Sequence, residues 1–242
     1  MESGRLLHLC RLHPGFPGDT PENIRRDIGI IQRELPLDLL EFFCLTPLPG
    51  SEDHKRKLLA GEPMDADMNR YDVEHVCMEH PRMTREEWEG IYREAWRLYY
   101  TPAHMETVMR RAAATRISPG KMMFLLIWFY GCVTIEHIHP LEGGYLRRKV
   151  RTDRRPGMPI ENPLLFYPRY AAEVVAKHLR IARVIWRMAR VRRAIKRDPH
   201  ARDYRDIALT PVADEEFAEL EMFNVSDAAR AAAEKARKTV AA

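Results

Sequence analysis

The chain lacks any group of cysteines close enough together to hold a metal. Its four cysteines stand at positions 10, 44, 77 and 132, so no two of them form a CxxC pair or a short Cys/His cluster. The first residues also lack the apolar segment and cleavage site of a secretory signal peptide. We therefore expect free thiols in a reducing cytosol rather than a disulfide framework.

A long apolar run is missing as well. The longest one, Met122–Ile135, is shorter than the roughly 18 to 20 residues that a membrane-spanning helix needs. This run predicts a buried core helix. A helix that lies against a membrane surface is the alternative, because a basic segment follows it. We accordingly expect a cytoplasmic protein, with peripheral membrane contact left open.

The composition is otherwise that of a globular protein, with 45% hydrophobic and 31% charged residues. The 242 residues suffice for one large domain or two small ones. The net charge of +4 hides an uneven distribution, because sixteen Lys and Arg but only three acids lie between Arg147 and Arg197. Such a segment favours a solvated face or contact with an anionic membrane. Nucleic acid is less favoured, since no aromatic or helix-turn-helix pattern accompanies the charge.

The first 50 residues predict one α/β unit. Residues 13–22 hold two glycines and three prolines and are typical of a constrained loop. Thr20 is a good N-cap and Pro21 suits the first helical position. Apolar residues then recur on one helix face, and Leu37–Leu45 is a short apolar run typical of a buried parallel strand. The stripe on the helix comprises Ile24, Ile28, Ile31 and Leu35.

The remainder of the chain is predicted to be mainly helical. Thr84 and Glu87 form the pattern of a capping box, and the helix that they begin carries Trp88, Ile91, Ala95 and Leu98 on one face. An Arg-rich and Pro-rich connector without clear periodicity covers residues 143–168. The helices that we expect cover residues 51–60, 84–100, 102–114, 119–138 and 170–196.

Two loops carry a recognisable pattern. Gly15–Thr20 reads GFPGDT and resembles the GFPGET segment after the fifth strand of the radical S-adenosylmethionine (SAM) barrel, and Thr46–Ser51 resembles the PxPGT segment after the sixth. Tyr71–Val76, Met83–Glu87 and Arg93–Tyr100 resemble stretches downstream of the barrel. Over residues 14–115 the chain thus resembles radical SAM proteins of the cobalamin (B12)-binding type.

The resemblance implies a fold class and a domain organisation. The fold would be an α/β remnant of a radical SAM TIM-type barrel, holding its last strands, followed by a mainly α-helical C-terminal region. Residues 1–50 would supply the strand-five end, a helix and strand six. A post-barrel helical region (51–115), an Arg-rich helical extension (116–223) and a flexible tail (224–242) would follow.

The resemblance also implies cofactors and site residues. Such enzymes use S-adenosylmethionine and a [4Fe-4S] cluster held by a CxxxCxxC motif, together with cobalamin in this type. This sequence contains no CxxxCxxC motif, which implies that the chain alone binds none of these cofactors. Either the chain is a truncated or split-gene part of a longer protein, or a partner chain supplies the missing half-barrel. The implied residues at the adenosine side are Gly15, Phe16, Pro17, Gly18, Thr46 and Pro47.

The intact enzyme would perform radical chemistry, such as alkylation or rearrangement, on an unknown substrate, for which a lipid-like molecule is one candidate. A competing hypothesis is a non-catalytic helical module that contacts a membrane surface or a partner protein through a basic stripe. That stripe lies on the helix expected at 170–196, where arginines recur every three or four residues opposite an apolar face. The arginines are Arg180, Arg183, Arg187 and Arg190, and the apolar face comprises Val174, Ile181, Ile185 and Met188.

Two further clusters suggest metal sites but have simpler explanations. His137 and His139 stand two residues apart, so on a helix they point about 200° from each other and cannot share one metal as an i, i+4 pair does. The end of a helix, where the dipole favours histidine, explains the two histidines that follow Glu136 better. A solvated connector is favoured over a divalent metal site for Asp65, Asp67, Asp72, His75 and His80.

Overall fold

The computed structural model describes residues 7–72 and 74–210. The chain divides into a compact unit of residues 1–208 and a second unit of residues 209–242, and the contacts described below lie in the first. The predicted tail (224–242) lies outside the described residues. The elements are β1 (Leu9–Leu12), α1 (Pro21–Glu34), β2 (Leu39–Phe42), α2 (Glu52–Leu59), the 3₁₀ helix η1 (Met68–Arg70), α3 (Arg85–Tyr99), α4 (Pro102–Ala114), α5 (Pro119–Tyr130), the π-helix η2 (Gly131–Glu136), α6 (Pro163–Arg197) and the 3₁₀ helix η3 (Ile207–Leu209).

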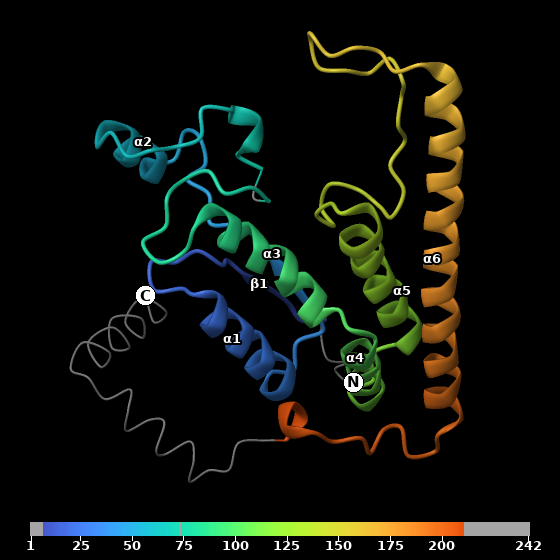
Figure 1. Ribbon diagram of the computed structural model, residues 1–242. Helices are drawn as coiled ribbons and strands as arrows, with labels where there is room; N and C mark the ends of the chain where they lie inside the picture. Colours follow the sequence, from blue (N-terminus) through green and yellow to red (C-terminus); the bar gives the residue numbers. More distant parts are fainter. Residues whose placement is uncertain (1–6, 73, 211–242) are drawn as a thin grey trace, which may run out of the picture. The chain divides into compact units, whose positions relative to one another are not determined.

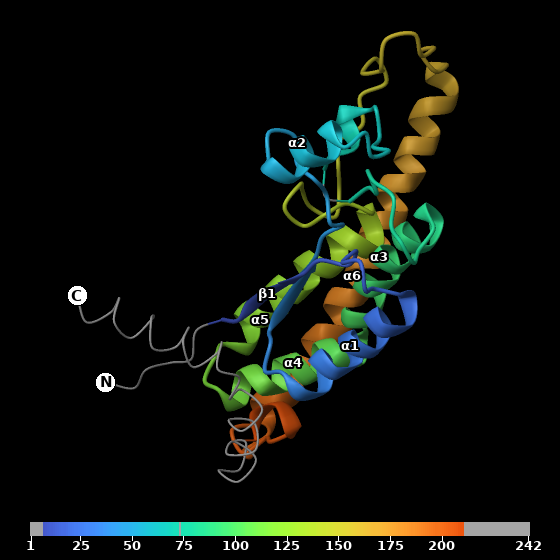
Figure 2. The same ribbon diagram turned by 90° about the vertical axis from the view of Figure 1, so that its left-hand side faces the viewer.

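The two strands form a parallel pair, as predicted. β1 and β2 are in register from Leu9 opposite Leu39 to Leu12 opposite Phe42, and α1 makes the crossover between them. All four residues of β2 are buried, whereas β1 is mostly exposed. The chain is therefore a mixed α/β protein in which two parallel strands alternate with helices before a mainly helical region (Figures 1 and 2).

The helix α1 begins as the sequence predicts. The Thr20 side chain accepts a hydrogen bond from the backbone N–H of Asn23, whose side chain bonds back to the backbone of Thr20. Ile24 and Ile28 are buried, and α1 packs beside α3 over the strands (Figure 1). Leu35 is the C-cap of α1 and is largely exposed, so the predicted apolar stripe ends one turn earlier than expected.

Aromatic side chains of α3 form the centre of the core. Trp88, Ile91 and Ala95 are buried, as predicted for one face of this helix. Trp96 lies edge-on against Phe42 of β2, with ring centroids 5.1 Å apart. Large aromatic groups thus join the sheet to the helical region, and such contacts contribute beyond the area that they bury.

The apolar segment from Met122 is a core helix, in agreement with the first of its two interpretations. α5 packs against both α4 and α6 (Figure 1), and Met122, Leu126 and Phe129 are buried. Phe124 and Trp128 on its other side are exposed. Among the described residues, no helix has both the length and the apolar character needed to cross a membrane.

Two helix boundaries differ from the prediction. The helix expected at 119–138 is α-helical only to Tyr130 and then widens into the π-helix η2. A Cβ on Gly131 would lie 2.9 Å from Cβ of Tyr145, so the missing side chain permits a close approach at this transition. The apolar run Met122–Ile135 does not reveal the change from α-helix to π-helix. A π-turn adds only one residue to the helical turn, so the spacing of the apolar residues is hardly altered.

The long helix α6 begins at Pro163 rather than at residue 170. Asn162 caps the helix and Pro163 occupies its first turn. The prediction assigned both residues to the irregular connector and therefore placed the start of the helix too late. Pro168 cannot donate to the carbonyl of Leu164, but Leu164 is 81% exposed, so water can satisfy that group. The packed face of α6 also differs from the predicted apolar face. Ile185, which was predicted to pack, is 44% exposed, whereas Lys177 is buried.

Candidate functional site

The two loops singled out in the sequence are tied together beyond the carboxyl ends of the strands. The Pro14 carbonyl accepts hydrogen bonds from the backbone N–H of Leu45, at 3.2 Å, and from Nε1 of Trp88, at 2.9 Å. Loops at this edge of parallel strands are where α/β proteins build their binding sites. The parallel pairing therefore brings Gly15–Thr20 and Thr46–Ser51 to one edge of the sheet.

The first loop uses its own backbone donors. Oδ2 of Asp19 accepts hydrogen bonds from the backbone N–H groups of Gly15, at 2.8 Å, and Phe16, at 2.9 Å. Nε2 of His80 lies 2.8 Å from the Phe16 carbonyl. These two N–H groups are thus committed to Asp19, and the loop presents the exposed ring of Phe16 together with Pro17 and Gly18.

The second loop, Thr46–Ser51, leaves fewer groups accessible to a ligand. The Thr46 hydroxyl donates to the Cys44 carbonyl at 3.0 Å, and Pro47 is buried. Gly15 in the first loop is buried as well. Of the residues implied at the adenosine side, only Phe16, Pro17 and Gly18 are exposed.

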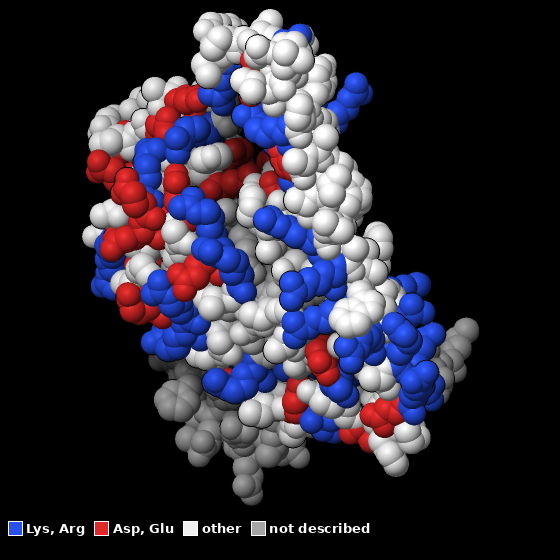
Figure 3. Space-filling view, turned by 45° about the vertical axis from the view of Figure 1, so that its right-hand side comes forward, with Lys and Arg blue, Asp and Glu red and all other residues white. Residues whose placement is uncertain are grey.

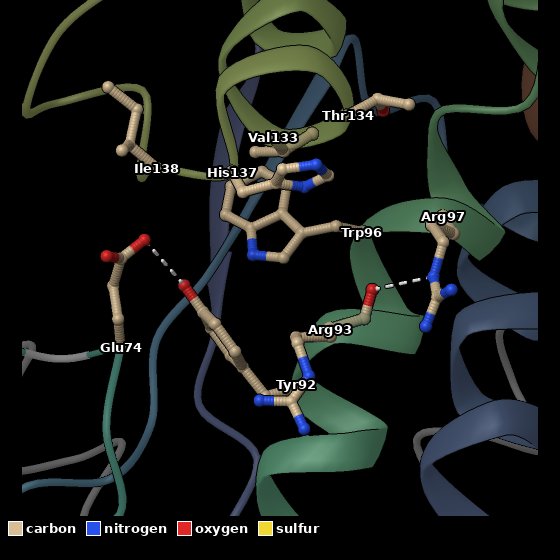
Figure 4. A pocket seen from close by; sticks show the side chains of 9 residues that line it. All are labelled: Glu74, Tyr92, Arg93, Trp96, Arg97, Val133, Thr134, His137 and Ile138. Atoms are coloured by element: carbon tan, nitrogen blue, oxygen red, sulfur yellow. Dashed lines mark hydrogen bonds between the residues drawn. The ribbon is translucent and has the colours of Figure 1, made fainter. Parts of the chain in front are cut away.

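A pocket of about 330 Å³ lies close to the end of β2 (Figure 4). Side chains of α3, of the π-helix and of the segments around them line it, and none of the residues implied at the adenosine side does. The thiol of Cys44 donates to the Glu74 carbonyl at 3.4 Å, which links the pocket to the strand. The lining residues are Glu74, Tyr92, Arg93, Trp96, Arg97, Val133, Thr134, His137 and Ile138.

Glu74 is the chemically distinctive group of this pocket. Burial raises the pKa of its carboxyl to about 7, and the negative charges of Glu142 and Asp72 act in the same direction. The Tyr92 hydroxyl lies 3.5 Å from Oε1 of Glu74, and burial raises the pKa of this phenol, so Tyr92 stays a neutral donor (Figure 4). A carboxyl with a pKa near neutrality can give or take a proton under physiological conditions.

Two backbone features border the pocket. Val133 and Thr134 belong to the π-helix, an element that is frequent at functional sites. His137 has φ 59° and ψ 48°, a left-handed conformation uncommon outside glycine. Sequence reasoning marked His137 but missed the other lining residues, since they come from separate segments whose meeting leaves no local signal.

The cluster around Glu136, His137 and His139 is split by the fold. His137 does end the helix, as predicted. His139 leaves it and is buried between the rings of Phe43, at 4.6 Å, and Trp96, at 5.4 Å, and burial lowers its pKa to about 4. Glu136 forms an ion pair with Lys177 at 2.5 Å, which explains why a lysine is tolerated on the packed face of α6.

The acidic connector after α2 forms ion pairs instead of a common centre. Asp65 pairs with Arg85 at 2.8 Å, and Asp72 lies 2.8 Å from Nδ1 of His75. His80 contacts the first loop. Within residues 7–72 and 74–210, no group of three or more His, Cys, Asp or Glu could hold a metal ion.

The thiols do not fit an iron–sulfur cluster. Three of them are buried and donate to backbone carbonyls: Cys44 to Glu74, Cys77 to Arg70 and Cys132 to Gly143. Burial raises the pKa of Cys77 and of Cys132 to about 11, whereas cluster ligands are thiolates. The described residues therefore supply no cluster site.

Replacing Glu74 by glutamine should remove a pH dependence of stability. The folded carboxyl holds its proton up to about pH 7, whereas an unfolded chain releases it near the ordinary glutamate pKa of 4.5. The folded state thus binds the extra proton, and this contribution to stability is lost as pH rises from 4.5 through 7. We expect Glu74→Gln to gain stability relative to wild type as pH increases, measured by urea unfolding between pH 5 and 8.

The exposed Glu79→Gln variant serves as the control and should keep the wild-type profile. The buried histidines have lowered pKa values, so they make the free energy of unfolding rise with pH. All three proteins contain them, and their contribution therefore cancels when a variant is compared with wild type. Parallel stability curves for Glu74→Gln and wild type would contradict the assignment.

Comparison of the chain with protein-family models, curated proteins and solved structures finds no match. The function is therefore inferred from the two loops and the strand edges.

Proposed function

We propose that the chain forms the last two strands and the C-terminal helical region of a radical SAM protein of the cobalamin-binding type. One observation carries the proposal: the GFPGDT loop follows β1, the TPLPGS loop follows β2, and the two strands are parallel neighbours. The resemblance requires this arrangement of strands five and six. Two strands that did not pair, or that paired antiparallel, would have been incompatible with the resemblance.

The far edge of β2 supports the proposal. Residues 39, 41 and 43 face β1, so the backbone groups of Leu40 point to the opposite edge. There the Tyr100 hydroxyl donates to the Leu40 carbonyl at 2.9 Å and accepts from the Leu40 N–H at 3.2 Å. A side chain thus occupies the place of a further strand, as expected if β2 is the last strand of a sheet.

The outer edge of β1 is different. In the described part of the chain β1 pairs only with β2, and the backbone groups of Leu9 and Arg11 point away from it. Leu9, Cys10 and Arg11 are all exposed. An open edge of this kind is suited to an additional parallel strand and otherwise promotes association.

The cluster ligands would lie outside these 242 residues, on the same longer polypeptide or on a partner. In the intact protein, S-adenosylmethionine and the [4Fe-4S] cluster would supply radical chemistry on a substrate not yet identified, with lipid-like molecules as one candidate class. Because the buried thiols do not fit a cluster, the chain by itself would be incompetent for that chemistry on this proposal.

The test joins the chain to the polypeptide encoded by the DNA directly upstream. We expect that DNA to encode a CxxxCxxC motif in the same or a neighbouring frame. After anaerobic reconstitution with iron and sulfide, the joined protein should show the visible absorbance of a [4Fe-4S] cluster. With dithionite added as the one-electron reductant, it should cleave S-adenosylmethionine to methionine and 5′-deoxyadenosine.

The control is the 242-residue chain treated identically, which should bind no cluster. A joined variant with the three cysteines changed to alanine should behave like this control. An upstream sequence without such a motif, together with a stable monomeric chain, would overturn the proposal.

A further inference from the structure

α6 carries a second apolar stripe on the side away from its packed face. The packed face contains Ile181, Met188 and Ile195, all buried. The second stripe has the 3,4 spacing of a heptad seam and extends over about 32 Å of helix. Its residues are Leu165, Pro168, Ala172, Val175, Leu179, Ala182 and Trp186, and every one of them is exposed.

This stripe is unusual for the surface of a monomer. Leu179 is 67% and Trp186 59% exposed, and Leu164 and Tyr167 widen the apolar surface at the start of the helix. Contiguous exposed apolar surface indicates an interaction site, whereas scattered apolar residues do not.

A row of arginines lies beside the stripe. Arg180, Arg183 and Arg187 line a groove of about 420 Å³ whose apolar wall includes Met105 and Met188. All three arginines are exposed, and none makes an ion pair or hydrogen bond with any residue that the structure describes. Most other arginines of the described chain have a carboxylate or carbonyl partner, so this row is available for external anions.

The charge along α6 is one-sided. Its 35 residues contain ten Lys and Arg and one acid, Glu173, which pairs with Lys149 and Lys177. Figure 3 shows mainly white surface at the upper right, where the first half of α6 lies, with blue Lys and Arg atoms gathered beside and below it.

We propose that α6 docks on the surface of an anionic lipid bilayer. The apolar stripe would enter the boundary between headgroups and acyl chains, and the row of Arg180, Arg183 and Arg187 would bind lipid phosphates at its side. Trp186, at the end of the stripe, has the amphipathic ring that is typical of this boundary. Charge complementarity argues against a second copy, because the row of Arg180, Arg183 and Arg187 on one helix would meet the same row on the other.

This inference goes beyond the proposed radical SAM function and does not depend on it. The test uses the complete 242-residue chain in flotation with vesicles of phosphatidylcholine alone and of phosphatidylcholine with phosphatidylglycerol. We expect binding to the anionic vesicles only, weakened by added salt. Each cation near an anionic surface contributes about fivefold to partitioning, so changing Arg180, Arg183 and Arg187 together to glutamine should weaken binding roughly a hundredfold.

A matched triple variant controls for net charge. Arg26, Arg33 and Arg56 are exposed on α1 and α2, and changing them to glutamine removes the same charge elsewhere. This control should bind much as wild type does. Leu179→Ser with Trp186→Ser should also lose binding while keeping the wild-type melting temperature, because both side chains are exposed.

A spectroscopic readout locates the contact. Brominated lipid should quench the Trp186 fluorescence, and Trp186→Phe should remove that quenching while retaining most of the binding. Equal binding to neutral vesicles, equal loss in the two triple variants, or binding of an acidic protein through these arginines without any vesicle binding would overturn the proposal. Release by millimolar inorganic phosphate at constant ionic strength would point to a free-phosphate site and overturn it as well.

Discussion

Replacing Gly15 by alanine should destabilise the protein by about 4 kcal/mol, because two independent costs act at this position. Gly15 has φ +126°, a backbone conformation that side chains rarely adopt. A Cβ there would lie 1.9 Å from Cζ2 of the buried Trp88, so the indole would have to move. Trp88 also donates to the Pro14 carbonyl, so its displacement would disturb the contact between the two loops. Urea unfolding of the two proteins measures the difference.

Gly61 provides the matched control. Its φ is +69°, but a Cβ there would meet nothing within 4 Å, so Gly61→Ala should cost only the backbone strain of about 1 kcal/mol. Trp88→Phe makes room beside Gly15, so its effect and that of Gly15→Ala should be less than additive. Equal destabilisation by Gly15→Ala and Gly61→Ala would show that the close contact with Trp88 is unimportant.

The helix α1 and the strand β2 could be predicted because their signals are local. The cap at Thr20, the proline after it and the apolar strand at 39–42 each act within a few residues. The pocket could not be predicted in this way. Glu74, Tyr92 and His137 come from three segments, and the pKa of Glu74 depends on burial that only the tertiary structure creates.

The long helix shows a different limit of sequence reasoning. The sequence of α6 contains two apolar stripes, and periodicity alone does not decide which one is packed. The prediction took Val174, Ile181, Ile185 and Met188 as the packed face, which is right for Ile181 and Met188 but wrong for Ile185. Lys177 lies on the packed face because Glu136, from a distant segment, accepts its charge.

Replacing Arg111 by methionine should cost about 3 to 4 kcal/mol, because this guanidinium is buried and joins three separate segments. Its nitrogens lie 2.9 Å from the Gln32 carbonyl, 3.3 Å from the Leu35 carbonyl and 2.7 Å from Oδ2 of Asp206. The two carbonyls belong to the end of α1, where helices leave carbonyl groups without intrahelical partners. Methionine would fill the space but remove the donors that bond the two carbonyls and Asp206, and each hydrogen bond of a buried charged group contributes about 1.5 to 3 kcal/mol.

The neighbouring Arg110 makes a direct comparison possible. It forms an i, i+4 pair with Glu106 on the accessible side of α4, so Arg110→Met should change the free energy of unfolding by less than about 0.5 kcal/mol. Arg111→Lys retains the charge but not the planar fork of donors, so it should recover only part of the loss. Guanidinium chloride unfolding of the three variants tests this order. Equal effects of Arg110→Met and Arg111→Met would mean that the buried position of Arg111 adds nothing to its contribution.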